Sequence, residues 1–290
     1  MSRRWEKVGI IAGGGELPRQ LAQAAHDMDA PYHVIRLNGF ADEAMKAFPG
    51  DDAGIGEAGK IIRLLKKSEC DAVVFAGLVQ RPNFGQLKPD WRGAALLPRV
   101  VAAARKGDGA MLDVLVETFA AEGFLVIGAE EVTGVLRSEA GTLGQIVPDD
   151  VAYADMKKAA ALIEAIGPFD VGQGAIVREG FVVAVEAAEG TDAMLRRAAP
   201  IIARLQGEEG DGGHRAGLLL KRPKPGQEMR IDLPTIGART VELAAEAGLA
   251  GIAIAAGESL LLDAEEAIRL ADERGLFIHA YSAEELKRRT

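Results

Sequence analysis

Short apolar runs alternate with longer helix-like runs through the first 127 residues, and this rhythm constrains the fold most strongly. Strands are predicted at 7–12, 32–37, 72–76 and 124–127, and helices at 17–28, 57–68 and, as one or two helices broken near Gly107 and Gly109, at 98–122. Strands that alternate with helices form βαβ units with right-handed crossovers. The first half is therefore expected to be a parallel sheet covered by helices.

The second half has a different rhythm. Helices are predicted at 149–166, from Thr191 to 205, after Ile236 and at 264–274. Strands are predicted as a hairpin over 175–177 and 181–186, a buried run at 218–220, a paired region within 251–262 and a last strand at 276–280. The hairpin makes a mixed sheet the expectation. Residues 128–148 look like a linker and 206–217 like a flexible loop, so we place two domains at 1–134 and 135–290.

Composition narrows the class of protein. At 290 residues, about two domains are expected, and the net charge of −9 argues against general binding to nucleic acid. The single cysteine, Cys70, excludes an intramolecular disulfide and fits a reducing cytoplasm. No apolar run approaches the roughly 18 residues that cross a bilayer. We expect a soluble cytoplasmic protein, with contact to a membrane surface left open and a homodimer as the default oligomer.

The stretch 218–240, LLLKRPKPGQEMRIDLPTIGART, carries more chemistry than any other part of the sequence. Its apolar run should deliver Lys221 to a loop, where prolines end the strand. Lys224, Gln227, Glu228, Asp232 and Thr235 follow before the next helix. Cations at a strand-to-helix passage suit a phosphorylated ligand, and a carboxylate there can hold a metal ion. A solvated loop shaped by proline and glycine is the equal alternative.

A glycine loop, Gly13-Gly14-Gly15, lies between the first predicted strand and helix. Such a loop can leave backbone N–H groups free to meet a phosphate at a helix N-terminus. It is not a dinucleotide fingerprint, because Pro18 stands where the third glycine is needed, and the second strand ends in Arg36 and Leu37 instead of an acidic residue. A ligand-facing loop and a tight turn without a ligand both remain open.

Three further loops lie at positions in the predicted fold where ligands commonly bind. Gln80 and Arg81 follow the third predicted strand of the first half, where ligands of open sheets bind. Gly141 and Thr142 lie where the two halves meet, and Gly190 and Thr191 end a hairpin strand and open a helix. Surface-loop and N-cap roles are the alternatives, although Glu186 and Glu189 could also join Asp232 around a metal. The four histidines show no zinc spacing, and GxSxG and Walker motifs are absent.

Taken in order, several long motifs resemble one family: IIAGGGELP, FAGLVQRPNF, GDGAMLDVL, EAGTLG, GQGAIV, VEAAEGTDAML and KPGQEMRIDLPTIG. The chain resembles the UDP-2,3-diacylglucosamine pyrophosphatases of the lipid A pathway, in the form that is not a metallophosphoesterase. The resemblance covers nearly the whole chain. It implies an N-terminal Rossmann-like domain, a C-terminal α/β catalytic domain and a lipid site between them. It also implies magnesium-dependent hydrolysis of UDP-2,3-diacylglucosamine to UMP and 2,3-diacylglucosamine 1-phosphate.

The resemblance and the motifs together give a set of site residues. The aspartate that the family needs for turnover matches Asp232, whereas Glu228 stands where an aspartate is expected. We expect Asp232, Lys221 and Lys224 to be catalytic, and Asp232 and Glu228 to hold Mg²⁺. The residues expected to bind substrate are Gly13, Gly14, Gly15, Gln80, Arg81, Gly141, Thr142, Gly190, Thr191, Gln227 and Thr235.

Two other classes of protein compete with a hydrolase. A non-catalytic carrier of a nucleotide sugar or glycolipid would also need cations and apolar walls. It would have no need for carboxylates beside a pyrophosphate unless a metal lies between them. An NADP-dependent oxidoreductase is disfavoured by Pro18 and by the missing acidic residue, although Arg36 has the right charge for a 2′-phosphate.

Overall fold

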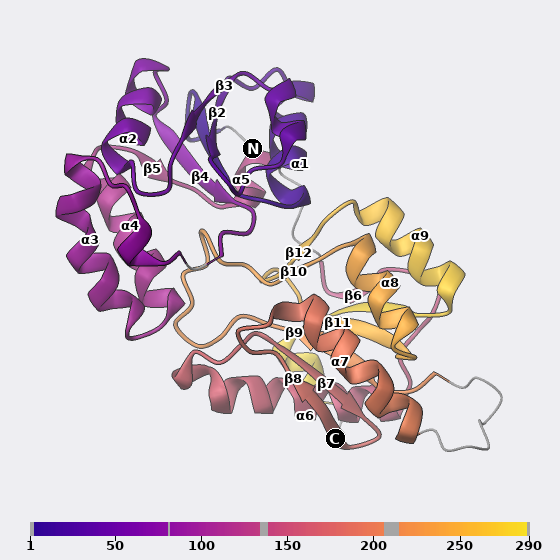
Figure 1. The fold of residues 1–290 in the computed structure, drawn as a ribbon. Helices are drawn as coiled ribbons and strands as arrows, with labels where there is room; N and C mark the ends of the chain where they lie inside the picture. Colours follow the sequence, from indigo (N-terminus) through magenta and orange to yellow (C-terminus); the bar gives the residue numbers. More distant parts are fainter. Residues whose placement is uncertain (1–2, 81, 134–138, 206–214, 289–290) are drawn as a thin grey trace. The chain divides into compact units, whose positions relative to one another are not determined.

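The computed structural model describes residues 3–80, 82–133, 139–205 and 215–288. The chain divides into two compact units. The first comprises Met1–Val135 and Glu228–Asp232, and the second comprises Leu136–Gln227 and Leu233–Thr290. Each unit has its own sheet (Figure 1). Each also has its own cluster of buried apolar side chains. The predicted α/β class, with a parallel first sheet and a mixed second sheet, is confirmed.

The sheet of the first unit has five parallel strands in the order β3-β2-β1-β4-β5. Their bounds are β1 Val8–Ala12, β2 Tyr32–Leu37, β3 Gly50–Ala53, β4 Ala72–Ala76 and β5 Leu125–Val126. Every residue of β1 is buried, as in a central parallel strand covered on both faces. The four predicted strands formed. The edge strand β3 was missed because its sequence, GDDA, contains no apolar run.

Helices cover both faces of this sheet. They are α1 Glu16–Asp27, α2 Ala58–Lys67, α3 Trp91–Ala104, α4 Asp108–Ala121 and α5 Ala129–Thr133, with short 3₁₀ turns η1 Glu43–Ala47 and η2 Phe84–Gln86. The connection through α1 joins β1 to β2, toward the β3 edge of the sheet. The connection through α2 joins β3 to β4, in the opposite direction across the sheet. Right-handed crossovers therefore place these two helices on opposite faces. The helical region predicted over 98–122 is two helices broken at Gly107, and the first begins earlier, where Asp90 caps α3.

The core of the first unit includes a contribution from late in the chain. Residues of α2 and α4, such as Leu65 and Phe119, pack with strand residues such as Ile11 and Ile35. Ile231, which belongs to Glu228–Asp232, packs against the same cluster. The turn formed by these five residues is thus held by the hydrophobic core of the first unit.

The sheet of the second unit has six strands in the order β6-β13-β11-β9-β7-β8. Their bounds are β6 Gly141–Thr142, β7 Gly174–Arg178, β8 Phe181–Val185, β9 Leu218–Lys221, β11 Gly251–Ala255 and β13 Phe277–Tyr281. β9, β11 and β13 are parallel, whereas β6, β7 and β8 pair antiparallel to their neighbours. The mixed sheet follows from the predicted hairpin.

Two layers of helix enclose this second sheet. α7 Gly190–Leu205, α8 Ala238–Glu246 and α9 Ala264–Arg274 pack on one face, which contains Leu219, Ile252 and Ile278. α6 Asp150–Ile166 and α10 Ala283–Arg288 pack on the other, which contains Leu218, Leu220 and Ala253. Successive residues of β9 thus face opposite layers, as a pleated strand requires. The short turn η3 Gly167–Phe169 follows α6, which Asp149 caps by accepting from the Ala152 N–H at 2.8 Å.

Some predicted boundaries were wrong. The region 251–262 does not form a strand pair, because β12 Leu260–Leu261 pairs with β10 Thr235–Ile236 in a separate two-stranded sheet. The stretch 128–148, predicted as a linker, contains α5 and β6 among its described residues. Most of the predicted loop at 206–217 lies outside the described residues. Lys221 belongs to β9 itself instead of the loop after it.

Candidate functional site

The glycine loop of the first unit meets the loop that follows β4. Gly13 donates its N–H to the Ala76 carbonyl at 2.8 Å, and Gly14 donates to the Leu78 carbonyl at 3.0 Å. Leu78 donates back to the Gly14 carbonyl at 2.8 Å. The loops join at the point where the strand order reverses, which is where open α/β sheets bind ligands. At this point, the chain's own backbone joins the two loops.

The N–H of Gly15 also has an acceptor within the chain. It donates to Oδ2 of Asp42 at 2.8 Å, so a carboxylate lies at the N-terminal end of α1. The expectation that Gly13, Gly14 and Gly15 offer free N–H groups is therefore wrong, because all three donate internally. A phosphate at this helix terminus would have to displace Asp42, which already occupies the position favoured for an anion.

Close backbone approach explains why glycine is needed in these loops. A Cβ added at Gly13 would lie 2.7 Å from the Leu78 carbonyl oxygen. A Cβ added at Gly77, which has a φ of +88°, would lie 2.5 Å from the Gly14 carbonyl oxygen. These separations are shorter than van der Waals contact. The geometry supports the tight-turn reading of the glycine loop.

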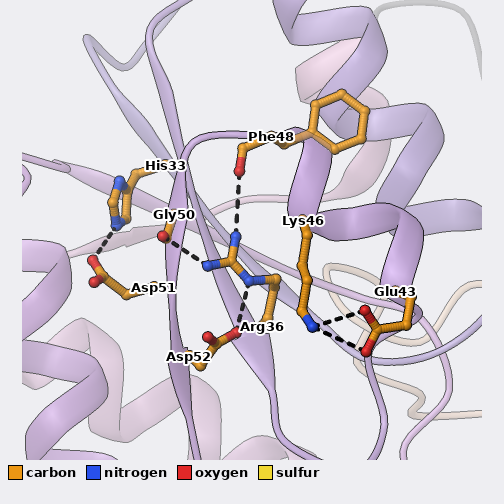
Figure 2. A network of polar contacts seen from close by, with 8 residues as sticks. All are labelled: His33, Arg36, Glu43, Lys46, Phe48, Gly50, Asp51 and Asp52. Carbon is orange, nitrogen blue, oxygen red and sulfur yellow. Dashed lines mark hydrogen bonds and ion pairs between the residues drawn. The ribbon is translucent and has the colours of Figure 1, made fainter.

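Arg36 has a structural role at the edge of the first sheet. Figure 2 shows its guanidinium among β2, β3 and the chain that joins them. It donates to Oδ1 of Asp52 at 2.7 Å, to the Gly50 carbonyl at 2.8 Å and to the Phe48 carbonyl at 3.2 Å. His33 and Asp51 form a second link between the same strands, with Nε2 and Oδ2 2.9 Å apart. These bonds hold β3 against β2. The Arg36 guanidinium is used in them, which disfavours the role of binding a cofactor 2′-phosphate.

The loop after β4 offers fewer described ligand groups than expected. Gln80 is exposed, and Arg81 lies outside the described residues. The Asn83 side chain accepts from the Gly85 N–H at 3.1 Å and caps η2. Gln80 therefore remains the described candidate among the residues that were predicted here.

The second unit places Lys221 in a buried polar cluster at the carboxyl end of β9. Its side chain donates to Oγ1 of Thr191 at 2.8 Å and to the Thr235 carbonyl at 3.1 Å. Thr191 in turn donates to Oε1 of Glu186 at 2.7 Å. Lys221 is 4% exposed and Glu186 is 7% exposed. The structure thus brings together three of the predicted residues, Lys221, Thr191 and Thr235.

Two of the predicted roles change at this cluster. Thr191 lies inside α7, which begins at Gly190, so it is not the N-cap of that helix. Glu189 pairs with Arg197 at 2.6 Å, which lowers the pKa of its carboxyl group and directs it to the helix surface. Gly190 has a φ of +78°, a conformation that favours glycine at the entry to α7. Glu186 and Glu189 therefore have different partners, and the described contacts do not join them around a metal.

Lys224 and Gln227 form a second small cluster in the same unit. The Lys224 ammonium pairs with Oδ1 of Asp170. The Lys224 N–H donates to Oε1 of Gln227 at 2.7 Å, and Nε2 of Gln227 donates to Oε1 of Gln173 at 2.9 Å. Lys224 is thus less available to a substrate than the sequence predicted, because a carboxylate already balances its charge.

Glu228 and Asp232 lie on the turn that packs with the first unit. Arg230 donates to both carboxylate oxygens of Glu228, from Nε at 2.8 Å and from Nη2 at 2.5 Å. These bonds lower the pKa of Glu228. The Asp232 N–H donates to the Glu228 carbonyl at 3.0 Å, which closes the turn, and the Asp232 side chain is half-buried.

The donor set of this turn fits magnesium through one carboxylate. Mg²⁺ usually binds one or two protein carboxylates and takes its other oxygens from water and substrate phosphates. Asp232 would supply one such carboxylate. Arg230 engages both oxygens of Glu228, so Glu228 would have to break that pair to bind an ion. Within the described ranges, no group of three or more His, Cys, Asp or Glu side chains is arranged to hold a metal ion.

A buried network that the sequence did not predict surrounds Thr142. Its Oγ1 lies 3.1 Å from Nδ1 of His279, and Nε2 of His279 lies 3.1 Å from Oε2 of Glu285. Tyr153 donates to Oε1 of Glu285 at 2.9 Å. Thr142 is cross-strand to His279, and Gly141, with a φ of +133°, precedes it. These residues come from four separate elements, so no local spacing in the sequence could have indicated the network.

Comparison with known proteins follows the division of the chain. The family description "LpxI N-terminal domain" matches residues 7–136, and "LpxI C-terminal domain" matches residues 139–279. The UDP-2,3-diacylglucosamine pyrophosphatase LpxI of Caulobacter vibrioides is 48% identical over 272 residues, which cover 94% of this chain and 96% of that protein. Among solved structures, N5-carboxyaminoimidazole synthase from Aspergillus clavatus, in complex with ADP and 5-aminoimidazole ribonucleotide, matches at 14% identity. That match covers 63% of this chain and 41% of the synthase, with a TM-score of 0.24, too low to carry an argument.

The fold and the candidate site define a structural class of protein. The class is an α/β protein of two units, one with a five-stranded parallel sheet and one with a mixed sheet that has polar clusters at its edges. The chain belongs to the LpxI family, because the two domain descriptions span it almost completely and the relative is nearly half identical. None of its described helices has the length and apolarity to cross a membrane.

Proposed function

We propose that this chain hydrolyses the pyrophosphate bond of UDP-2,3-diacylglucosamine, releasing UMP and 2,3-diacylglucosamine 1-phosphate. The observation that carries the proposal is the 48% identity to the LpxI pyrophosphatase of Caulobacter vibrioides, which extends over 94% of this chain. The reaction class is hydrolysis of a phosphorus anhydride, and the place of the reaction is lipid A biosynthesis.

The described residues can supply the chemistry that this reaction needs. Displacement at phosphorus develops negative charge, and the ammonium group of Lys221 is a counter-charge held at a fixed position. Asp232 can accept the proton of the attacking water as a general base. Lys224 contributes less, because Asp170 pairs with it. We propose that turnover requires residues of both units.

Magnesium is part of the proposal. Asp232 would hold it together with phosphate oxygens of the substrate, and the bound ion would stabilise charge on the pyrophosphate. The remaining parts of the proposal are a cytoplasmic enzyme that takes its acylated substrate from the inner membrane surface, and a homodimer. They rest on the chemistry of the substrate and on the frequency of two-fold dimers.

The test uses purified protein and UDP-2,3-diacylglucosamine in detergent micelles. UMP and 2,3-diacylglucosamine 1-phosphate should appear in equal amounts, measured by chromatography and mass spectrometry. Tight binding of the substrate without UMP release would show a carrier and overturn the proposal. Mass spectrometry of small molecules that remain bound after purification gives an independent check, since a diacylated glucosamine phosphate would support the substrate class.

A further inference from the structure

Three buried side chains form a chain of hydrogen bonds at the carboxyl end of β9. Lys221 donates to Oγ1 of Thr191 at 2.8 Å, and Thr191 donates to Oε1 of Glu186 at 2.7 Å. Lys221 comes from β9, Thr191 from the first turn of α7 and Glu186 from the residue after β8. The end of β9 therefore meets the junction of β8 and α7, which lies 30 residues earlier in the chain, in one buried polar cluster.

The direction of each hydrogen bond follows from chemistry. An ammonium group has donors only, so Thr191 must accept from Lys221. A hydroxyl has a single proton, and a carboxylate accepts, so Thr191 gives its proton to Glu186. The Thr191 hydroxyl therefore has no second proton to donate to a phosphate. Its proton is used on Glu186, and its oxygen accepts from Lys221.

The Thr191 hydroxyl lies between the Lys221 ammonium group and the Glu186 carboxylate. In the described part of the chain, no ion pair joins Lys221 directly to a carboxylate, and Glu186 acts on it through the Thr191 hydroxyl. A buried charge without a direct partner is costly, and the cost falls when an anion binds beside it. Lys221 uses two donors on Thr191 and Thr235, which leaves the third N–H of the ammonium for another acceptor.

We propose that Glu186 and Thr191 are positioning residues that hold the Lys221 ammonium group toward the pyrophosphate of the substrate. The inference rests on the proposed function and assigns these two residues a part in it. Thr191 fixes the direction of the ammonium, and Glu186 fixes the Thr191 hydroxyl. A directly paired Glu186 would neutralise Lys221, whereas a carboxylate one hydroxyl away stabilises the charge and leaves it available.

The experiment compares four variants in one steady-state hydrolysis assay with UDP-2,3-diacylglucosamine. Thr191→Val keeps the shape and removes the hydroxyl, and we expect kcat/KM to fall about 10- to 100-fold, as for loss of a hydrogen bond to a charged group. Thr191→Ser keeps the hydroxyl and should recover most of the loss. Glu186→Gln keeps an acceptor and removes the charge, so its loss should be smaller than that of Thr191→Val. Thr118→Val is the matched control, because the Thr118 hydroxyl donates within its own helix, to the Val114 carbonyl at 2.6 Å.

A double mutant separates positioning from a general structural role. If Thr191 acts through Lys221, then Thr191→Val should cause almost no further loss in a Lys221→Met background, while thermal melts show that all variants fold. Equal losses in both backgrounds, or wild-type kcat/KM in Thr191→Val, would overturn the inference while leaving the proposed function intact. A wild-type protein that releases no UMP would overturn both.

Discussion

Arg230, two residues before Asp232, donates hydrogen bonds to both carboxylate oxygens of Glu228, at 2.8 and 2.5 Å. The pair closes a turn whose backbone is also fixed by the Asp232 N–H, which donates to the Glu228 carbonyl. Glu228 therefore helps to close the turn that carries Asp232. An aspartate was expected at this position, and the glutamate found there is paired through both of its oxygens with Arg230.

The first prediction tests this support. Arg230→Met keeps much of the side-chain volume and removes both bonds to Glu228. We expect a lower kcat, because Asp232 loses its fixed position, with a stability loss of only about 0.2–1 kcal/mol, the range for a partly exposed ion pair. Steady-state kinetics and urea unfolding measure the two quantities. Arg239→Met, which removes an exposed arginine paired with Glu242, is the control. An unchanged kcat in Arg230→Met would show that the pair does not position Asp232.

The second prediction concerns Asp232 itself. Asp232→Ala should fold and still bind uncleaved substrate, but lose about 10²–10⁴-fold in kcat if the carboxylate acts as a general base. The loss appears in kcat because the interaction is made chiefly in the transition state. Single-turnover kinetics and equilibrium binding separate these effects. A variant with a lowered melting temperature and a wild-type rate would remove Asp232 from the mechanism.

Metal removal gives the third prediction. Dialysis against a chelator should abolish UMP release, and added Mg²⁺ should restore it, because in the proposed function Asp232 would hold the ion together with phosphate oxygens of the substrate. Isothermal titration of Mg²⁺ into wild-type protein and Asp232→Asn, with a non-hydrolysable substrate analogue present, should show weaker binding in the variant. Full activity in excess chelator would contradict the magnesium proposal.

The fourth prediction compares two glycines of the first unit. Gly77→Ala should destabilise the protein by about 1–3 kcal/mol beyond the conformational cost, because its Cβ would meet the Gly14 carbonyl oxygen at 2.5 Å. Gly15→Ala is the matched control. It has a similar φ of +89°, but no atom lies within 4 Å of the added Cβ, so only the backbone cost of a non-glycine residue at φ +89° and ψ −177°, about 1–3 kcal/mol, remains. Equal melting temperatures for the two variants would show that the loops do not approach so closely.

The fifth prediction is a dependence of stability on pH. Burial alone would raise the pKa of Glu285, but hydrogen bonds from Tyr153 and His279 outweigh it and leave the pKa below its ordinary value of 4.5. A carboxyl group with a lowered folded pKa stabilises the protein above its unfolded pKa, and this stabilisation is lost as the pH falls through the folded value. Wild type should therefore lose its advantage over Glu285→Gln as the pH falls below 4.5. Thermal melts across that range are the measurement, and a constant difference would contradict the prediction.

Periodicity predicted the fold well where a segment is buried on both faces. The runs that became β1, β4 and the first three residues of β9 are continuous and apolar, so tertiary packing agreed with the local pattern. It failed for β3, whose GDDA sequence is held at the edge by bonds from Arg36 and His33. Such cross-strand bonds have no local signature.

Sequence motifs indicated residues of the candidate site, but they did not indicate the hydrogen-bond partners of those residues. Lys221 and Thr191 were identified from their motifs, yet their hydrogen bond joins residues 30 positions apart. The network of Tyr153, His279 and Glu285 was missed because an isolated histidine carries no spacing signal. The glycine loop was identified, but its donors are used by Asp42 and by the loop after β4, which only the folded backbone reveals.

The packing of Ile231 into the core of the first unit has a consequence for synthesis. A nascent chain that ends before this residue contains all the strands and helices of that unit but lacks one of its apolar contacts. The first unit can fold early on the ribosome, but it is completed only after most of the second unit has been translated. Asp232 is thus brought to its final place by a late event.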